Sequence, residues 1–192
     1  MQPKYYGAAA RYNKSGSTTP LTRRLLVIGG LVVGVIIFAI VVFSVLGAIS
    51  KGPQDAFTHF AARESNLATL MDQQSPHIQS GDLSAINVTG KLLFNGDNSA
   101  AQRLLTSAFG LQAIPADVTA SETDNTVTTS LQNASLNGTF DHTYVSILQQ
   151  EIASTYNGAQ ALASSGGAIG ALAKKAMANL TTINDQLTAL KL

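Results

Sequence analysis

The chain has 192 residues, no cysteine and a formal net charge of only +1. The lack of cysteine excludes disulfides, a thiolate nucleophile, a zinc–thiolate site and a lipid-modified N-terminal cysteine. Residues 1–24 carry five Lys or Arg and no acid, whereas residues 51–192 carry 7 Lys or Arg against 11 Asp or Glu, a net charge of −4. This mildly acidic region has no basic stripe, so we expect no nucleic-acid partner.

Residues 1–24 predict a disordered cytoplasmic tail. They are rich in Gly, Ala, Ser and Thr and show neither a helical nor a strand period. Such a composition cannot bury enough apolar surface to offset the entropy of ordering the chain.

Residues 25–49 predict a transmembrane helix. The run LLVIGGLVVGVIIFAIVVFSVLGAIS, from Leu25 to Ser50, contains no charged residue, and roughly 20 apolar helical residues cross a bilayer. The run is too long for the apolar region of a cleavable signal peptide, and Leu46 occupies the first small-residue position of the best cleavage site, residues 46–48. We therefore expect an uncleaved signal anchor.

The flanking charges predict the orientation of this segment. Arg23 and Arg24 precede it directly and would keep the N-terminus in the cytoplasm. The chain is thus expected to be a single-pass protein of the cell membrane, with residues 51–192 extracytoplasmic. Gly30 and Gly34 form a GxxxG pair that could let two such helices associate, although glycine is also frequent in membrane helices for other reasons.

Residues 53–137 predict several helices of unequal clarity. Residues 53–75 place apolar side chains at helical spacing after Pro53, which a first helical turn tolerates. A second helix is expected from a cap at Asp82 to Phe94, followed by a turn at NGDN (95–98) and a short helix. Residues 115–137 are expected to be helical despite many Thr and Ser.

Residues 139–190 predict a helical hairpin. Thr139 is the expected cap of a first helix, SSGG (164–167) is a short connection, and a second apolar stripe follows. So short a connection makes the two helices antiparallel. The fold class is therefore expected to be all-α, an antiparallel, four-helix-like bundle after the membrane helix.

The run FDHTYVSILQQEIASTYNGAQALASSGGAIGALAKKAMANLTTINDQL, within residues 139–190, resembles the hairpin of small bacterial ferritin-like bundle domains of uncharacterised function. The resemblance implies a helical bundle. Metal-binding ferritin-like proteins carry Glu-x-x-His on two helices. Here Ser154 follows Glu151 and Leu67 follows Glu64 at that spacing, so both motifs are absent.

Glu64 and Glu151 are the candidate chemical groups. Glu64 lies within the apolar stripe of its helix, where a carboxylate is costly unless it is paired or ligated, and Glu151 lies at the edge of a similar stripe. Two inward carboxylates could bind a metal ion or a small ligand. Alternatively, Glu64 pairs with Arg63 or Arg103, or reaches solvent.

No complete catalytic motif is present: the chain has no HExxH, GxSxG, SxxK, P-loop or GxGxxG signature in a suitable context. We therefore expect no enzyme and no cofactor. The favoured function is a structural or protein-interaction module held at the membrane, with the bilayer, a protein partner or a second copy of the membrane helix as its partners. The alternative is a small-ligand or metal-binding bundle.

Overall fold

The computed structural model describes residues 52–192, which form six α-helices, one 3-10 turn and no strand. The predicted tail and membrane segment, with Arg23, Arg24, Gly30 and Gly34, lie outside the described residues. Within them, no helix combines the length and the apolar character needed to cross a bilayer. The elements are α2 (Pro53–Gln74), η1 (Ser75–His77), α3 (Gly81–Phe109), α4 (Ala116–Ser121), α5 (Asn125–Leu136), α6 (Phe140–Leu162) and α7 (Gly167–Ala189).

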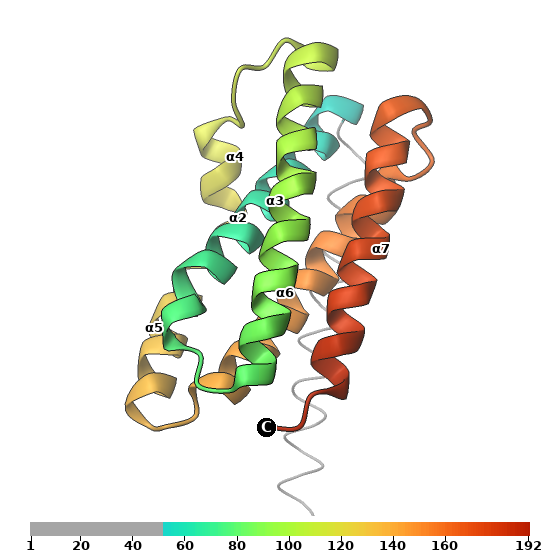
Figure 1. Cartoon of the computed structure of the whole chain (residues 1–192). Coiled ribbons are helices and arrows are strands. Elements are labelled where there is room, and N and C mark those ends of the chain that lie inside the picture. Colours follow the sequence, from blue (N-terminus) through green and yellow to red (C-terminus); the bar gives the residue numbers. More distant parts are fainter. Residues whose placement is uncertain (1–51) are drawn as a thin grey trace, which may run out of the picture. The chain divides into compact units, whose positions relative to one another are not determined.

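The four long helices α2, α3, α6 and α7 pack as a bundle (Figure 1). Around it α2 contacts α3, α3 contacts α7, α7 contacts α6, and α6 contacts α2. The short helices lie on the outside, α4 against α2 and α5 against α6. This arrangement confirms the expected all-α class and the helical hairpin of α6 and α7.

Local signals explain most helix ends. Pro53 opens α2, where its missing N–H costs nothing. The Ser80 hydroxyl caps α3 by accepting a hydrogen bond from the Leu83 amide at 3.3 Å, so the prediction of Asp82 as the cap was wrong by two residues. Thr139 precedes α6 as expected, but its side chain makes no capping bond. Gly110 ends α3 with a φ of 70°, a left-handed conformation that glycine adopts without strain.

The predicted turn at residues 95–98 is wrong, because these residues lie inside α3, a continuous helix of 29 residues. Asn and Gly favour turns as isolated segments. Here, however, Phe94 and Ala101 on either side are fully buried, and Asp97 makes contacts with α7 that are described below. Tertiary contacts thus hold a locally weak helix together, as they often do.

Residues 115–137 form two helices, where the sequence predicted helical structure without indicating how many helices. The chain leaves α4 after Ser121 and starts α5 at Asn125. The Asp124 carboxylate accepts a hydrogen bond from the Thr126 amide at 2.8 Å, which caps α5 and explains the break.

The core of the bundle is divided into two apolar clusters. One lies toward the end of the bundle that carries the start of α3, and contains Leu67, Ala68, Met71, Leu83, Phe94, Leu131, Phe140, Tyr144, Leu148, Ile152, Leu180, Ile183 and Leu187. The other lies toward the start of α2, and contains Phe57, Phe60, Ala61, Ala101, Leu105, Ala159, Leu162, Leu172, Ala173 and Ala176. Along every long helix, the residues between the two clusters include a polar side chain.

Candidate functional site

A polar layer separates the two clusters. We define it as Glu64 of α2, Asp97 of α3, Thr155 of α6 and Asn179 of α7, together with Lys175 of α7, which bonds to Asp97. Glu64, Asp97 and Thr155 are at most 1% exposed. All four long helices therefore contribute to the layer. Buried charge in the middle of a small core is costly, which makes this layer the leading candidate site.

Glu64 is fully buried, and neither of its carboxyl oxygens has a hydrogen-bond partner among the described residues. Burial and, to a lesser extent, the nearby charge of Asp97 raise its pKa from 4.5 to about 8, although Lys175 acts in the opposite direction. At neutral pH the side chain is therefore an uncharged acid. The sequence-based alternative that Glu64 pairs with an arginine or reaches solvent is wrong.

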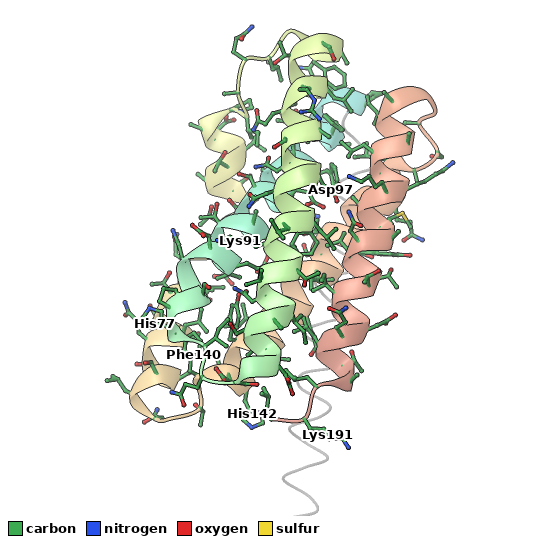
Figure 2. The ribbon with its side chains drawn as sticks, in the orientation of Figure 1. His77, Lys91, Asp97, Phe140, His142 and Lys191 are labelled. Atoms are coloured by element: carbon green, nitrogen blue, oxygen red, sulfur yellow. The ribbon has the colours of Figure 1, made fainter. Side chains whose placement is uncertain are left out.

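Asp97 is the paired acid of the layer. One carboxyl oxygen accepts a hydrogen bond from Lys175 Nζ at 2.8 Å, and the other accepts one from Asn179 Nδ2 at 2.6 Å. The Asp97 side chain has no exposed surface, whereas the Lys175 side chain is 61% exposed. Asp97 belongs to α3 and lies on the side of that helix that faces α7 (Figure 2). The lysine thus compensates the buried charge from the bundle surface.

Glu151 has different surroundings from Glu64. It is half-buried, and burial raises its pKa; the charges of Asp124 and Glu122 act in the same direction, while Arg63 opposes them. The charges that act on Glu64 are instead Asp97 and Lys175. The structure thus groups the predicted residue Glu64 with Asp97 rather than with Glu151. No cluster of three or more His, Asp or Glu suited to a metal ion occurs within residues 52–192.

A second polar group joins α2 to the segment between α4 and α5, and sequence reasoning missed it. Glu122 accepts a hydrogen bond from Arg63 Nε at 2.6 Å and lies 2.6 Å from His59 Nδ1. Arg63 also donates to the Ser154 carbonyl at 3.2 Å. Burial alone would raise the pKa of Glu122, but the hydrogen bonds and charges of Arg63 and His59 outweigh it and lower the pKa. No spacing rule links residues nearly 60 positions apart, so only the fold reveals this contact.

A third buried contact lies within the first apolar cluster. The Tyr144 hydroxyl donates to Asn87 Oδ1 at 2.5 Å, and Asn87 Nδ2 donates to the Met71 carbonyl at 2.9 Å. Burial raises the pKa of Tyr144, so the phenol stays protonated. The Tyr144 hydroxyl and the Asn87 side-chain nitrogen both have acceptors. We therefore interpret these two hydrogen bonds as a structural contact that links α2, α3 and α6.

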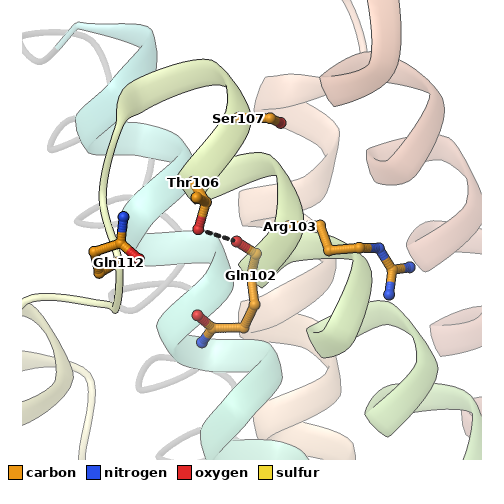
Figure 3. Close-up of a pocket in the computed structure, with 5 residues that line it drawn as sticks. All are labelled: Gln102, Arg103, Thr106, Ser107 and Gln112. Atoms are coloured by element: carbon orange, nitrogen blue, oxygen red, sulfur yellow. Dashed lines mark hydrogen bonds between the residues drawn. The ribbon is translucent and has the colours of Figure 1, made fainter.

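A surface pocket lies at the last turns of α3 and the loop that follows, lined by Gln102, Arg103, Thr106, Ser107 and Gln112 (Figure 3). Thr106 Oγ1 donates to the carbonyls of Gln102 and Leu111, at 3.3 and 3.1 Å. The pocket is open to solvent and contains no acid, and its one charged side chain, Arg103, is exposed. It has none of the converging, desolvated groups that mark a catalytic or tight binding site.

Comparison with protein-family models, with curated proteins and with solved structures gives no match. The resemblance of residues 139–190 to ferritin-like bundles therefore stays a prediction.

Proposed function

We propose that this chain is a single-pass membrane protein whose helical bundle lies outside the cytoplasm and acts as a protein-interaction module. The anchor and its orientation come from the apolar run and its flanking arginines. One surface feature of the bundle supports the interaction role, and it lies on α3.

Val88 and Leu92 form an exposed apolar pair on the outer surface of α3. They are 50% and 68% exposed, and their spacing of four residues places them on one helix face. The other exposed large apolar side chains of the described residues, Leu136 and Leu192, lie on other segments. An adjacent apolar pair on a helix suits a partner that presents an apolar groove or helix face.

Over residues 85–99, the exposed residues of this helix face carry no charge, and the exposed Arg103 follows on the next turn. The exposed residues around the pair are Ala85, Asn95, Gly96 and Ser99. Charged side chains are depleted in the centres of protein interfaces because desolvating them costs free energy. The composition of the face therefore agrees with the proposed contact.

Site-specific photo-crosslinking tests this role in the full chain within its native membrane. A photoreactive amino acid at Leu92 is expected to give one defined protein adduct. The same group at Thr181, an exposed position on α7, is the matched control and is expected to give none. A Val88→Asn substitution should reduce the adduct formed from position 92. Adducts with lipid alone, or equal adducts at both positions, would contradict the interaction role.

A second candidate function is a small-ligand or metal-binding bundle, in which Glu64 is a ligand. The unpartnered Glu64 carboxyl beside Asp97 favours this alternative. Of the two acids that the sequence suggested, Glu64 keeps this role, while Asp97 is better placed than Glu151 to act with it. Elemental analysis of the full chain, purified without chelator at neutral pH, is the test. A metal at unit stoichiometry that is lost in Glu64→Gln would support this function, and its absence in the unsubstituted chain would exclude a resident metal.

A further inference from the structure

The start of α2 fixes which end of the bundle is nearest the membrane, provided that the proposed anchor is correct. The predicted membrane segment ends at about Ile49, and α2 begins at Pro53. Four fully extended residue steps span at most about 14 Å. The first turn of α2 must therefore lie close to the membrane surface, whatever conformation the connection adopts.

Two other segments lie at the same end of the bundle as the start of α2: the end of α3 with its loop, and the connection from α6 to α7 (Figure 1). The rings of Phe57 in α2 and Phe109 in α3 have centroids 5.7 Å apart. Leu162 and Leu172 belong to the same apolar cluster as Phe57, and Ile169 packs against that cluster. These contacts place all three segments together.

These segments are unusual in their lack of charge. Residues 104–116 and residues 152–173 contain no Asp, Glu, Lys, Arg or His, although residues 51–192 as a whole have a net charge of −4. The opposite end carries Asp82 at the start of α3 and Asp141 at the start of α6, and at the end of the chain Asp185 and Lys191. Apart from Asp55 in the first turn of α2 and Arg103 near the end of α3, the segments at the end that the chain connection directs toward the membrane thus carry no charge.

We define the neutral surface as residues 106–114 and 161–170, and we propose that it rests on the lipid headgroups of the bilayer. Its exposed residues are small or uncharged, among them Gln112, Ala113, Ser164 and Ser165. Transferring such groups from bulk water to the headgroup region costs little, whereas a carboxylate there would lose hydration and be repelled by anionic lipids. Asp55, the acid of the first turn of α2, lies alongside His59, 3.8 Å from Nε2, and is outside this surface.

The absence of cysteine allows a direct test, because each introduced cysteine carries the only label. Single-cysteine variants at Gln112 and Ser165 report on the neutral surface. Matched variants at the exposed positions Gln79 and Gln186 report on the opposite end. The 22 residues of α2 separate the two ends by about 33 Å. Each variant is labelled with a small fluorophore and reconstituted as the full chain in vesicles of phosphatidylcholine and phosphatidylglycerol.

A nitroxide-headgroup lipid then quenches labels that touch the bilayer. We expect loss of fluorescence at positions 112 and 165 and none at positions 79 and 186. Adding acid to the surface, with Ala113→Glu and Ser164→Glu, should reduce the quenching at position 165, and more so in vesicles rich in phosphatidylglycerol. Equal quenching at the two ends would overturn the proposal. So would labels at 112 and 165 that are shielded from water but not quenched, since that result indicates a second copy or another protein on this surface.

Retention in the vesicles separates this proposal from the function on which it rests. A chain that alkaline extraction removes from the vesicles has no membrane anchor, and both proposals fail. A chain that is retained, but whose neutral-surface labels are not quenched, keeps the anchor and overturns only the orientation of the bundle.

Discussion

Glu64→Gln tests the buried polar layer most directly, because it preserves the size of the side chain and removes its ionisation. Burial, followed by the charge of Asp97, raises the pKa of Glu64 to about 8 in the folded chain, against an ordinary value of 4.5. Between these pH values, the folded chain keeps a proton that the unfolded chain has released. Because the folded state binds more protons in this interval, stability falls as the pH rises.

The expected size of the effect follows from this difference of one proton. It changes the free energy of unfolding by about 1.4 kcal/mol per pH unit. Over the interval from 4.5 to about 8, the total loss is on the order of 5 kcal/mol. The whole stability of a domain is about 5–15 kcal/mol, so the slope is large enough to measure. Glutamine at position 64 does not titrate, and its variant should lack this component of the slope.

Urea unfolding of the full chain in a mild detergent, followed by circular dichroism at pH 5, 6, 7 and 8, measures the slope. We expect the unsubstituted chain and Glu64→Gln to have similar stability at pH 5 and to diverge progressively above it, with the variant more stable. Asp185→Asn, at an exposed position of α7, is the control and should follow the unsubstituted chain. Parallel curves for the unsubstituted chain and Glu64→Gln would show that Glu64 is ionised in the fold, and would refute the reasoning.

Three further predictions use the same unfolding assay. Tyr144→Phe leaves the buried Asn87 Oδ1 without its donor and should cost about 1–3 kcal/mol. Gly96→Ala, at an exposed helical site with open space around it, should stabilise the chain by about 0.5–1 kcal/mol, whereas Gly90→Ala should gain less because a buried methionine lies 2.5 Å from the new Cβ. Glu122→Gln should cost about 1–3 kcal/mol of stability at neutral pH. Since the fold lowers the pKa of Glu122 from its ordinary value of 4.5, this cost should persist as the pH falls to about 4.5 and should disappear at lower pH.

The parts of the fold that sequence predicted well are those in which local and tertiary signals agree. In α2, Phe57, Phe60, Leu67 and Met71 follow the helical period and are all buried. The connection at residues 164–167 separates two stripes that both face the core, so the hairpin of α6 and α7 was also predictable. Periodicity succeeds here because the same residues determine the helix and its buried face.

The errors occur where tertiary contacts overrule local preference. Residues 95–98 have the composition of a turn, yet Asp97 points into the bundle and bonds to Lys175 and Asn179, about 80 positions later in the chain. Sequence identified Glu64 as an inward acid, which was correct. It proposed Glu151 as the second acid, because Glu64 and Glu151 both lie near apolar stripes. It could not show which side chain of a neighbouring helix lies next to Glu64. That question depends on how the four helices are rotated about their axes, which one sequence does not specify.

The polar layer also distinguishes the two proposed functions through its titration. If the bundle is only an interaction module, Glu64 stays an uncharged acid at neutral pH, and divalent cations leave the pH slope unchanged. If Glu64 binds a cation, the cation favours the ionised carboxylate, lowers the pKa of Glu64 and flattens the slope. Repeating the pH series with manganese or calcium therefore separates the alternatives in one assay. If the cation flattens the slope of the unsubstituted chain but does not affect Glu64→Gln, the ligand-binding bundle is favoured. If the slope of the unsubstituted chain does not respond to the cation, the exposed apolar pair Val88 and Leu92 on α3 is the feature of the bundle that supports a function.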